Sequence, residues 1–425
     1  MSELPPRGHV HLIAVCGVGM ASLAGLLQSQ GCRVTGSDQN VYPPMSTFLS
    51  ELGIEVLSGY KEEHLADKPD LVVIGNAVSR DNPEVRETLR LGVDYLSFPQ
   101  ALGRFLIGSK RSLVVAGTHG KTTTSSLMAW VLAKSGRQPS FFIGGMPANF
   151  SGGFTNGTGD WVVLEGDEYD SAFFDKGPKF LHYRPEKVIL TSVEFDHADI
   201  YRDLAHLKDA FRRLVELIPA SGTLLACNEY DAAKEAASHA RCPVSFYGSA
   251  EPRGWEAKNI RADSGATWFE PRYEGRSDGP VKLALMGKHN VSNALAVYAT
   301  ARELGIDHQS IAEAMATFQG VKRRQELKGE AGGITVLDDF AHHPTAVRET
   351  IEGVRSAYRG RRIWAVFEPR SNTSRRRIFA HEFPQALRGA VRSEEGVSTK
   401  NANVFRQQPV HPTDRLFLHR TDVAE

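Results

Sequence analysis

The most constraining feature of this sequence is a glycine-rich loop between a short apolar run and a helix-like stretch. The apolar run covers residues 113–116, and the loop reads Gly117-Thr118-His119-Gly120-Lys121-Thr122-Thr123. This order is typical of a phosphate-binding loop, because backbone N–H groups and the positive end of the helix attract phosphate oxygens. The usual pattern would place a glycine at Val115, so this loop is a shorter variant. We expect Lys121 to reach terminal phosphates and Thr122 to hold magnesium.

Short apolar runs recur along the chain, and a helix-like stretch follows each of them. This alternation predicts an α/β fold with mainly parallel sheets. A chain of 425 residues needs several hydrophobic cores. Strand-plus-loop openings at 9–20, 112–124 and 334–345 predict three nucleotide-binding types of unit. Glycine-containing polar segments near residues 108 and 321 predict domains at 1–108, 109–321 and 322–425. The polar tract 257–279 is expected to form an antiparallel hairpin or meander.

The composition excludes several classes of partner. Lysine plus arginine and aspartate plus glutamate both number 50, so no basic excess attracts nucleic acid or an anionic membrane. The four cysteines are scattered without a close pair, which favours reduced thiols in a cytoplasmic protein. The polar start of the chain and the early glycines indicate neither a signal peptide nor a membrane-spanning helix. We therefore expect a soluble, cytoplasmic protein of unknown oligomeric state.

Two acidic segments of the middle unit each follow an apolar strand-like run. They are residues 165–170 and 194–199, and they include Glu165 and His197. Strand ends beside a phosphate loop are where an open α/β sheet binds ligands. Carboxylate oxygen suits magnesium, whereas a histidine is a less typical magnesium ligand. The shared position of the two segments favours a metal site over solvated loops.

The first unit carries a partial dinucleotide-binding pattern. Gly17-Val18-Gly19 follows a strand-like run, but Ser22 stands where the pattern expects its third glycine. Residues 36–38 follow the next strand-like run. From these residues alone, binding of NAD, binding of another nucleotide such as a UDP-sugar, and a simple tight turn remain open.

Two later segments could contribute to the same chemistry. Asn290 lies near the start of a helix-like stretch, where it could read an adenine edge or cap the helix. Residues 338–345 combine paired acids and paired histidines at the end of a strand-like run. Such a combination favours a functional site over a purely structural turn, although Thr345 could cap the next helix.

Taken together, these segments resemble the Mur ligases of bacterial cell-wall synthesis. The resemblance rests on the order and spacing of 117–124, 165–170, 194–199, 289–290 and 338–345, and it runs from His9 to about Arg388. It implies a Rossmann-like N-terminal domain, a central P-loop ATPase-like domain and a Rossmann-like C-terminal domain. Residues 41–47, 168–176, 195–200 and 368–373 look most like the member that joins UDP-N-acetylmuramate to the tripeptide L-alanyl-γ-D-glutamyl-meso-diaminopimelate in peptidoglycan recycling.

The resemblance also implies roles for individual residues. Magnesium would be held by Thr122, Glu165 and His197, and catalysis would depend on Lys121, Glu165 and His197. The UDP-sugar, rather than NAD, would be bound by Gly17, Gly19, Met20, Ser37, Asp38, His342 and His343. ATP would be bound by Gly117, Thr118, His119, Gly120, Lys121, Thr122, Thr123, Asn290, Arg324 and Asp339. The reaction would pass through an acyl phosphate, with ATP and magnesium as cofactors.

The tail of the sequence departs from this family. Nothing after Ala390 resembles the family's further strands and glycine-rich segment, so residues 391–425 are expected to be irregular and foreign to the family, as a frameshift would produce. The C-terminal domain would then be incomplete. The alternatives are a ligase that adds L-alanine to UDP-N-acetylmuramate, an NAD-binding oxidoreductase, and a truncated nucleotide-binding protein without full turnover.

Overall fold

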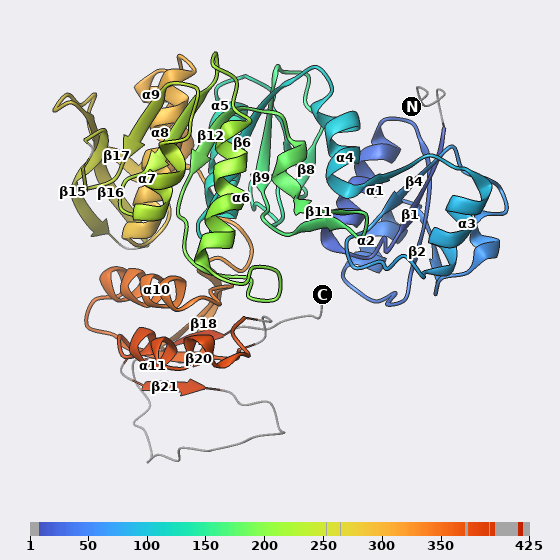
Figure 1. The fold of residues 1–425 in the computed structure, drawn as a ribbon. Helices are drawn as coiled ribbons and strands as arrows, with labels where there is room; N and C mark the ends of the chain where they lie inside the picture. Colours follow the sequence, from blue (N-terminus) through green and yellow to red (C-terminus); the bar gives the residue numbers. More distant parts are fainter. Residues whose placement is uncertain are drawn as a thin grey trace.

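The computed structural model of the chain describes residues 8–251, 253–263, 265–369, 373–390, 392–395 and 415–419. Within them, three large sheets follow one another along the chain, each with helices packed on it (Figure 1). This arrangement confirms the predicted α/β class. No helix of the described residues combines the length and the apolar character needed to cross a bilayer.

The N-terminal sheet is parallel and has the strand order β3-β2-β1-β4-β5. Its strands are β1 (His9–Ile13), β2 (Arg33–Asp38), β3 (Glu55–Ser58), β4 (Leu71–Ile74) and β5 (Tyr95–Ser97). The helices are α1 (Val18–Ser29), α2 (Met45–Glu51), α3 (Pro83–Leu91) and α4 (Phe98–Leu102). The chain crosses from one side of β1 to the other between β3 and β4. The loops after β1 and β4 therefore diverge there, which is where such sheets bind ligands.

The central sheet has the order β17-β16-β15-β14-β13-β12-β6-β9-β7-β8. Its parallel core consists of β6 (Arg111–Ala116), β7 (Ser140–Phe142), β9 (Trp161–Gly166), β12 (Pro185–Leu190), β13 (Thr223–Cys227) and β14 (Val244–Tyr247). The edges are β8 (Phe154–Thr155), β15 (Trp255–Asp263), β16 (Ala266–Tyr273) and β17 (Val281–Leu283). Strands β15, β16 and β17 pair antiparallel, as predicted for residues 257–279. A short separate ribbon pairs β10 (Asp170–Ala172) with β11 (Asp175–Pro178).

The two faces of the central sheet are buried in different cores. Leu113 and Val115 of β6 pack under α5 (Lys121–Lys134), α8 (Lys288–Glu303) and α9 (His308–Ala316). Val114 and Ala116 point to the opposite face, where α6 (Leu204–Glu216) and α7 (Asp231–Ala237) lie and where the same core continues into the N-terminal domain. A strand buried on both faces explains why this part of the sequence reads as a continuous apolar run.

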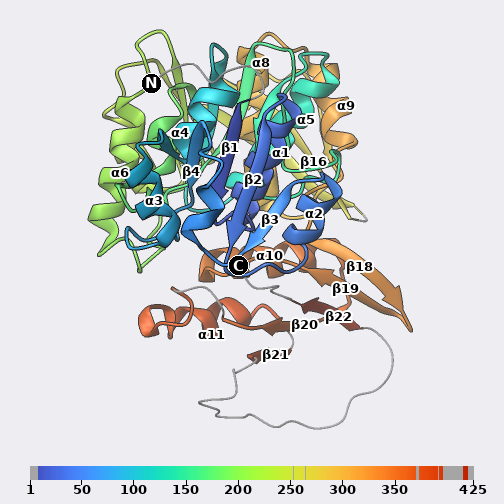
Figure 2. The same ribbon diagram turned by 90° about the vertical axis from the view of Figure 1, so that its right-hand side faces the viewer.

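The C-terminal sheet has the order β18-β19-β22-β20-β21, and only β18 is antiparallel to its neighbour. The strands are β18 (Glu326–Ala331), β19 (Ile334–Asp338), β20 (Arg362–Phe367), β21 (Arg392–Glu395) and β22 (Arg415–His419). The helices are α10 (Pro344–Ala357) and α11 (Glu382–Leu387). Figure 2 shows this domain below the other two, with α10 on the side that faces them.

The expectation of an irregular tail was wrong for two segments. Strand β21 pairs with β20, and β22 lies between β19 and β20 with a parallel partner on each side. The apolar part of β22 is only Leu416-Phe417-Leu418, which is too short a run to predict a strand from periodicity. It forms a strand because it pairs with β19 on one side and β20 on the other, and both are remote from it in the sequence. The rest of 391–425 and residues 370–372 of the quoted 368–373 motif lie outside the described residues.

We propose residues 108 and 321 as the domain boundaries. The N-terminal sheet ends with β5 before residue 108, and the central sheet begins with β6 after it. The central sheet ends with β17 before residue 321, and the C-terminal sheet begins with β18 after it.

Gly36 of β2 offers a test of how closely the N-terminal domain is packed. A Cβ atom at this position would lie 2.6 Å from Cβ of Val15, which is fully buried in the loop after β1. We expect Gly36→Ala to destabilise this domain by roughly 1–3 kcal/mol, the usual cost of overpacking a core. Amide hydrogen exchange, followed in peptides from β1 and β2, measures this loss of stability. Gly152→Ala, where a Cβ meets nothing within 4 Å, is the matched control. Equal protection in both variants would contradict the close packing.

Candidate active site

The glycine-rich loop connects β6 to α5, which begins at Lys121. Gly117 and Gly120 have φ angles of 136° and 78°, in the region that favours glycine. A Cβ atom at Gly117 would collide with the Thr191 hydroxyl, and one at Gly120 would collide with the Asn293 side chain. The loop is thereby pressed against the end of β12, where the Thr118 N–H donates to the Ser192 carbonyl at 3.0 Å. Both glycines are required by this close approach.

Lys121 is held by a carboxylate from the first acidic segment. Its ammonium group lies 2.9 Å from Oε1 of Glu168 and 2.6 Å from the Gly117 carbonyl. The same Glu168 oxygen is 2.9 Å from Nε2 of His197, and the Tyr201 hydroxyl donates to the Glu168 carbonyl at 2.6 Å. Burial disfavours both charges, yet the pKa of Lys121 is raised and that of Glu168 is lowered because each faces the other's opposite charge. Glu168 therefore joins two predicted site residues.

Glu168 itself was not among the predicted site residues. Its only signal in the sequence was its place in the acidic segment 165–170, and nothing in that segment distinguishes one carboxylate from the others.

The Thr122 hydroxyl donates to Oε1 of Glu165 at 2.7 Å, and the Gly144 N–H donates to Oε2 of Glu165 at 2.7 Å. A hydroxyl and a carboxylate side by side suit magnesium, which prefers oxygen ligands.

The predicted magnesium ligands are only partly brought together. Thr122 and Glu165 are in contact, and Arg324 lies 3.5 Å from the Thr122 hydroxyl. Within the described residues, no hydrogen bond or ion pair joins His197 to Glu165. His197 instead reaches the loop through Glu168 and Lys121.

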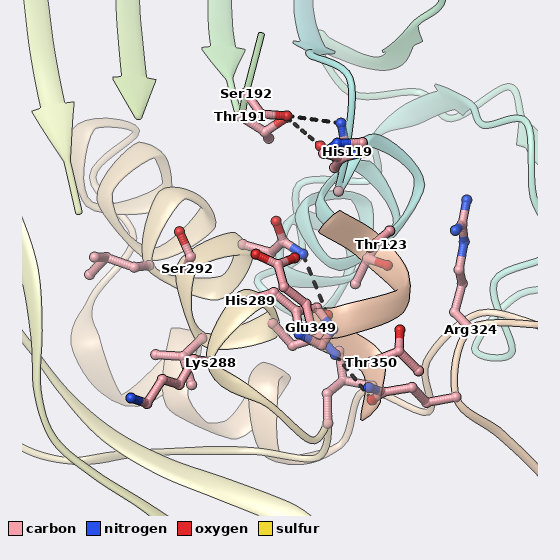
Figure 3. A pocket seen from close by; sticks show the side chains of 18 of the residues that line it. His119, Thr123, Thr191, Ser192, Lys288, His289, Ser292, Arg324, Glu349 and Thr350 are labelled. Carbon is pink, nitrogen blue, oxygen red and sulfur yellow. Dashed lines mark hydrogen bonds between the residues drawn. The ribbon is translucent and has the colours of Figure 1, made fainter. Parts of the chain in front are cut away.

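A pocket of about 420 Å³ opens beside the loop, between the central and C-terminal domains (Figure 3). Its wall includes the predicted ATP-binding residues His119, Gly120, Thr122, Thr123, Asn290, Arg324 and Asp339. Gly117, Thr118 and Lys121 are not part of this wall, although they belong to the loop that forms one side of it. Two residues not predicted as site residues, His289 and Glu349, also face the pocket (Figure 3).

The pocket wall contains partnered polar groups and one buried ring nitrogen without a partner. Nδ1 of His289 is buried without a hydrogen-bond partner, and burial lowers the pKa of this ring to about 4. Asn290 donates to the Met286 carbonyl at 2.8 Å, so its amide is fixed in place. The carboxylate of Asp339 accepts N–H groups of Gln325 and Ala341 at 2.8 and 2.7 Å, and burial raises its pKa. An unpartnered ring nitrogen beside a fixed amide suits a heteroaromatic base.

The residues predicted to bind a UDP-sugar fall into two groups. Gly17 is the N-cap residue of α1, and Gly19 and the buried Met20 lie in its first turn. Asp38 accepts the Cys16 N–H at 2.9 Å, so the loops after β1 and β2 meet. The Ser37 hydroxyl is fully buried and donates to Glu84.

His342 and His343 contact the central domain. Nε2 of His342 is 3.6 Å from Oδ2 of Asp196, and the His343 ring centroid is 4.5 Å from that of His119. Within the described residues, no hydrogen bond or ion pair joins them to Gly17 or its neighbours. Although burial opposes ionisation, His342 and His197 hold the pKa of Asp196 well below its usual range. Burial, with the nearby His119 ring, lowers the pKa of His343 to about 4.

Comparison with known proteins assigns a family to each part of this arrangement. Residues 9–110 match the catalytic domain of the Mur ligase family, and residues 115–301 match the Mur ligase middle domain. Residues 323–394 match the glutamate ligase domain of Mur ligases. The last match extends into β21, beyond the point where resemblance was expected to end.

Similar proteins cover most of the chain. The UDP-N-acetylmuramate–L-alanyl-γ-D-glutamyl-meso-2,6-diaminoheptandioate ligase of Escherichia coli is 42% identical over 95% of this chain and 85% of its own length. The protein of the same name from Haemophilus influenzae is 41% identical over 89% of this chain and 83% of its own. The UDP-N-acetylmuramate–L-alanine ligase of Salinibacter ruber is 36% identical over 88% and 77%.

Solved structures agree with these similarities. A murein peptide ligase from Psychrobacter arcticus superposes with a TM-score of 0.74 at 36% identity, covering 91% of this chain and 84% of that one. The UDP-N-acetylmuramate–alanine ligase of Thermotoga maritima has the same fold, with a TM-score of 0.79 at 24% identity over 97% and 95% of the two chains. The fold, the glycine-rich loop and these similarities together show that the chain belongs to the Mur ligase family.

Proposed function

We propose that this chain joins UDP-N-acetylmuramate to the tripeptide L-alanyl-γ-D-glutamyl-meso-diaminopimelate, using ATP, in the recycling of peptidoglycan. The observation that carries the proposal is the convergence of Lys121, Thr122 and Glu165 on one glycine-rich loop. The choice of acceptor is supported by identities of 42% and 41% to ligases named for this tripeptide, against 36% and 38% to two L-alanine ligases.

The first step forms an acyl phosphate. A carboxylate oxygen of UDP-N-acetylmuramate attacks the γ-phosphorus of ATP, the bond to the β,γ-bridging oxygen breaks, and ADP leaves. In this structure the ammonium group of Lys121 donates a hydrogen bond to Glu168. With ATP bound, Lys121 would turn to the terminal phosphates and offset the charge that builds up on the transferring group. The neutral peptide amine then attacks the acyl carbon, phosphate leaves as the amide bond forms, and the nitrogen releases one proton to the solvent.

The residues present fit magnesium as well as ATP. Thr122 and Glu165 would hold the ion with their oxygen atoms, and His197 would be a further ligand. When bound, magnesium would neutralise negative charge on the phosphate oxygens. The unpartnered His289 nitrogen and the amide of Asn290 would receive the adenine, and Asp339 the ribose.

The other substrate would lie between the N-terminal and central domains. Gly17, Gly19 and Met20 at the start of α1 would present backbone N–H groups to the UDP diphosphate. Asp38 would orient the uridine side, since it already fixes the loop after β1. His342 and His343 would face the reacting end of this substrate, because His343 lies against His119 of the glycine-rich loop and His342 lies beside Asp196 in the segment after β12.

Parallel assays of the two acceptors test the proposal. With ATP, magnesium and UDP-N-acetylmuramate, we expect phosphate release and a mass-detected adduct with the tripeptide. The kcat/KM for L-alanine should be lower by roughly 100-fold or more, since a small acceptor leaves polar groups of a peptide site unpaired. A preference for L-alanine would support the alanine-adding ligase. ATP binding without phosphate release with either acceptor would support a binding protein. NADH binding would support the oxidoreductase.

Replacing Glu168 tests its place beside Lys121 and His197. We expect Glu168→Gln to lower kcat roughly 10- to 100-fold, because a charge-assisted hydrogen bond contributes about 1.5–3 kcal/mol. Glu168→Asp should recover part of the rate, and circular dichroism checks the fold. The control is Asp170→Asn, since Asp170 pairs with the exposed Lys176 at 3.5 Å. Unchanged kcat in Glu168→Gln would exclude this positioning role.

We expect Glu349 to make ATP binding depend on pH. Burial and then the charge of Glu194 raise the pKa of Glu349 from its ordinary 4.5 to about 7, and its carboxyl lines the pocket. Below that pH the carboxyl is neutral, and above it the anion repels phosphate. We expect the affinity for ATP, measured by calorimetry from pH 6 to 8, to fall with rising pH. Ionisation of Glu349 should account for a roughly tenfold loss of ATP affinity across this pH range.

Glu349→Gln should bind ATP more tightly than the unchanged chain at pH 8 and about equally at pH 6. Glu313→Gln removes an exposed carboxylate of α9, which does not line the pocket, and should keep the full pH dependence. If both variants titrate like the unchanged chain, Glu349 does not face the phosphates.

A further inference from the structure

Three potential metal ligands from two domains meet at the glycine-rich loop, and none of them belongs to the Thr122–Glu165 pair. They are His119 of the loop, Glu194 in the segment after β12, and His343 at the start of α10. One ligand atom from each lies within 4.8 Å of the others. We propose that His119, Glu194 and His343 bind a transition-metal ion of the zinc class between the central and C-terminal domains.

Two of the ligands are already in contact and are held on a rigid frame. Nε2 of His119 lies 2.8 Å from Oε2 of Glu194. The His119 N–H donates to the Ser192 hydroxyl at 2.9 Å. The Thr118 hydroxyl donates to the Glu194 carbonyl and accepts the Glu194 N–H, both at 2.9 Å. The backbones that carry the first two ligands are therefore fixed to each other before any ion arrives.

The third ligand is placed by the C-terminal domain. His343 is the N-cap residue of α10, and its ring lies 4.5 Å from the His119 ring with an interplanar angle of 44°. The Thr345 hydroxyl of the same helix donates to Oε1 of Glu194 at 3.3 Å. Nδ1 of His343 accepts the Thr345 N–H at 3.2 Å, a long hydrogen bond that ligation through this nitrogen would replace. The helix start and Glu194 are thus already docked.

The donor set selects the kind of metal. Two imidazoles and one carboxylate are the ligands of zinc sites that keep a fourth position open. Magnesium prefers oxygen ligands and a nearly octahedral shell, so it fits Thr122 and Glu165 better than this cluster. The two sites would therefore take different ions.

Binding at this site would have a structural consequence that the magnesium site does not share. His119 and Glu194 belong to the central domain, whereas His343 belongs to the C-terminal domain. An ion held by all three would tie α10 to the glycine-rich loop. It would also hold His119 within the nucleotide pocket, so the exchange of nucleotides should slow when the ion is bound.

Cobalt provides a direct probe, because Co²⁺ takes zinc sites and absorbs visible light strongly when four-coordinate. Tag-free full-length chain, without nucleotide, is titrated with Co²⁺ and then with Zn²⁺. We expect one equivalent of Co²⁺ with a tetrahedral spectrum, displaced by Zn²⁺. In Glu194→Gln and His343→Asn the affinity for Co²⁺ should fall by more than roughly 10-fold. A loss of roughly 10-fold is the smallest effect expected when only a residue that supports a ligand is removed, and these variants remove a ligand itself.

The variants are chosen to separate ligation from folding. Asparagine is a good N-cap residue, so His343→Asn should keep α10, and circular dichroism checks both variants. Glu165→Gln removes the magnesium carboxylate and should keep the cobalt spectrum. Absence of a tetrahedral spectrum in the unchanged chain would overturn the proposal. So would equal binding by Glu194→Gln, or loss of the spectrum in Glu165→Gln. Because no turnover is measured, failure of the proposed ligase activity would leave this result unaffected.

Discussion

The site depends on the buried ion pair between Lys121 and Glu168. A lysine ammonium group with little access to water needs a counter-charge, and breaking such a buried pair by removing one partner typically costs about 3–5 kcal/mol. Glu168 supplies that charge at 2.9 Å and is nearly fully buried. Because the same carboxylate contacts His197, this pair also determines where the second acidic segment lies against the loop.

The order of strands explains why these groups meet. Strands β12, β6 and β9 are neighbours in the central sheet and run parallel, so their carboxyl ends share one edge. The glycine-rich loop follows β6, Glu165 lies at the end of β9, and Ser192 and Glu194 follow β12. Ligand binding at this edge is a general property of open α/β sheets. Segments that are far apart in the sequence therefore meet at one site.

The C-terminal domain completes the site rather than merely covering it. Helix α10 brings His343 against the His119 ring, and Glu349 lines the nucleotide pocket. Movement of this domain would therefore change the charge and the ligands around the phosphates together. A reaction with two anionic substrates and an amine benefits from such control, because closure excludes water from a reactive acyl phosphate.

The sequence alone determined the α/β class, the glycine-rich loop between a strand and a helix, and the two acidic segments that contain Glu165 and His197. These features have local signals: glycine spacing, short apolar runs and the polar residues that follow them. It did not distinguish Glu168 or Glu194 from the other acids of their segments, because the choice depends on which carboxylate faces Lys121 or His119. Strand β22 was missed because three apolar residues are too few to show a periodic hydrophobic pattern. Its two neighbours in the sheet are also remote in sequence. Only the tertiary structure decided these points, since burial and non-local pairing set them.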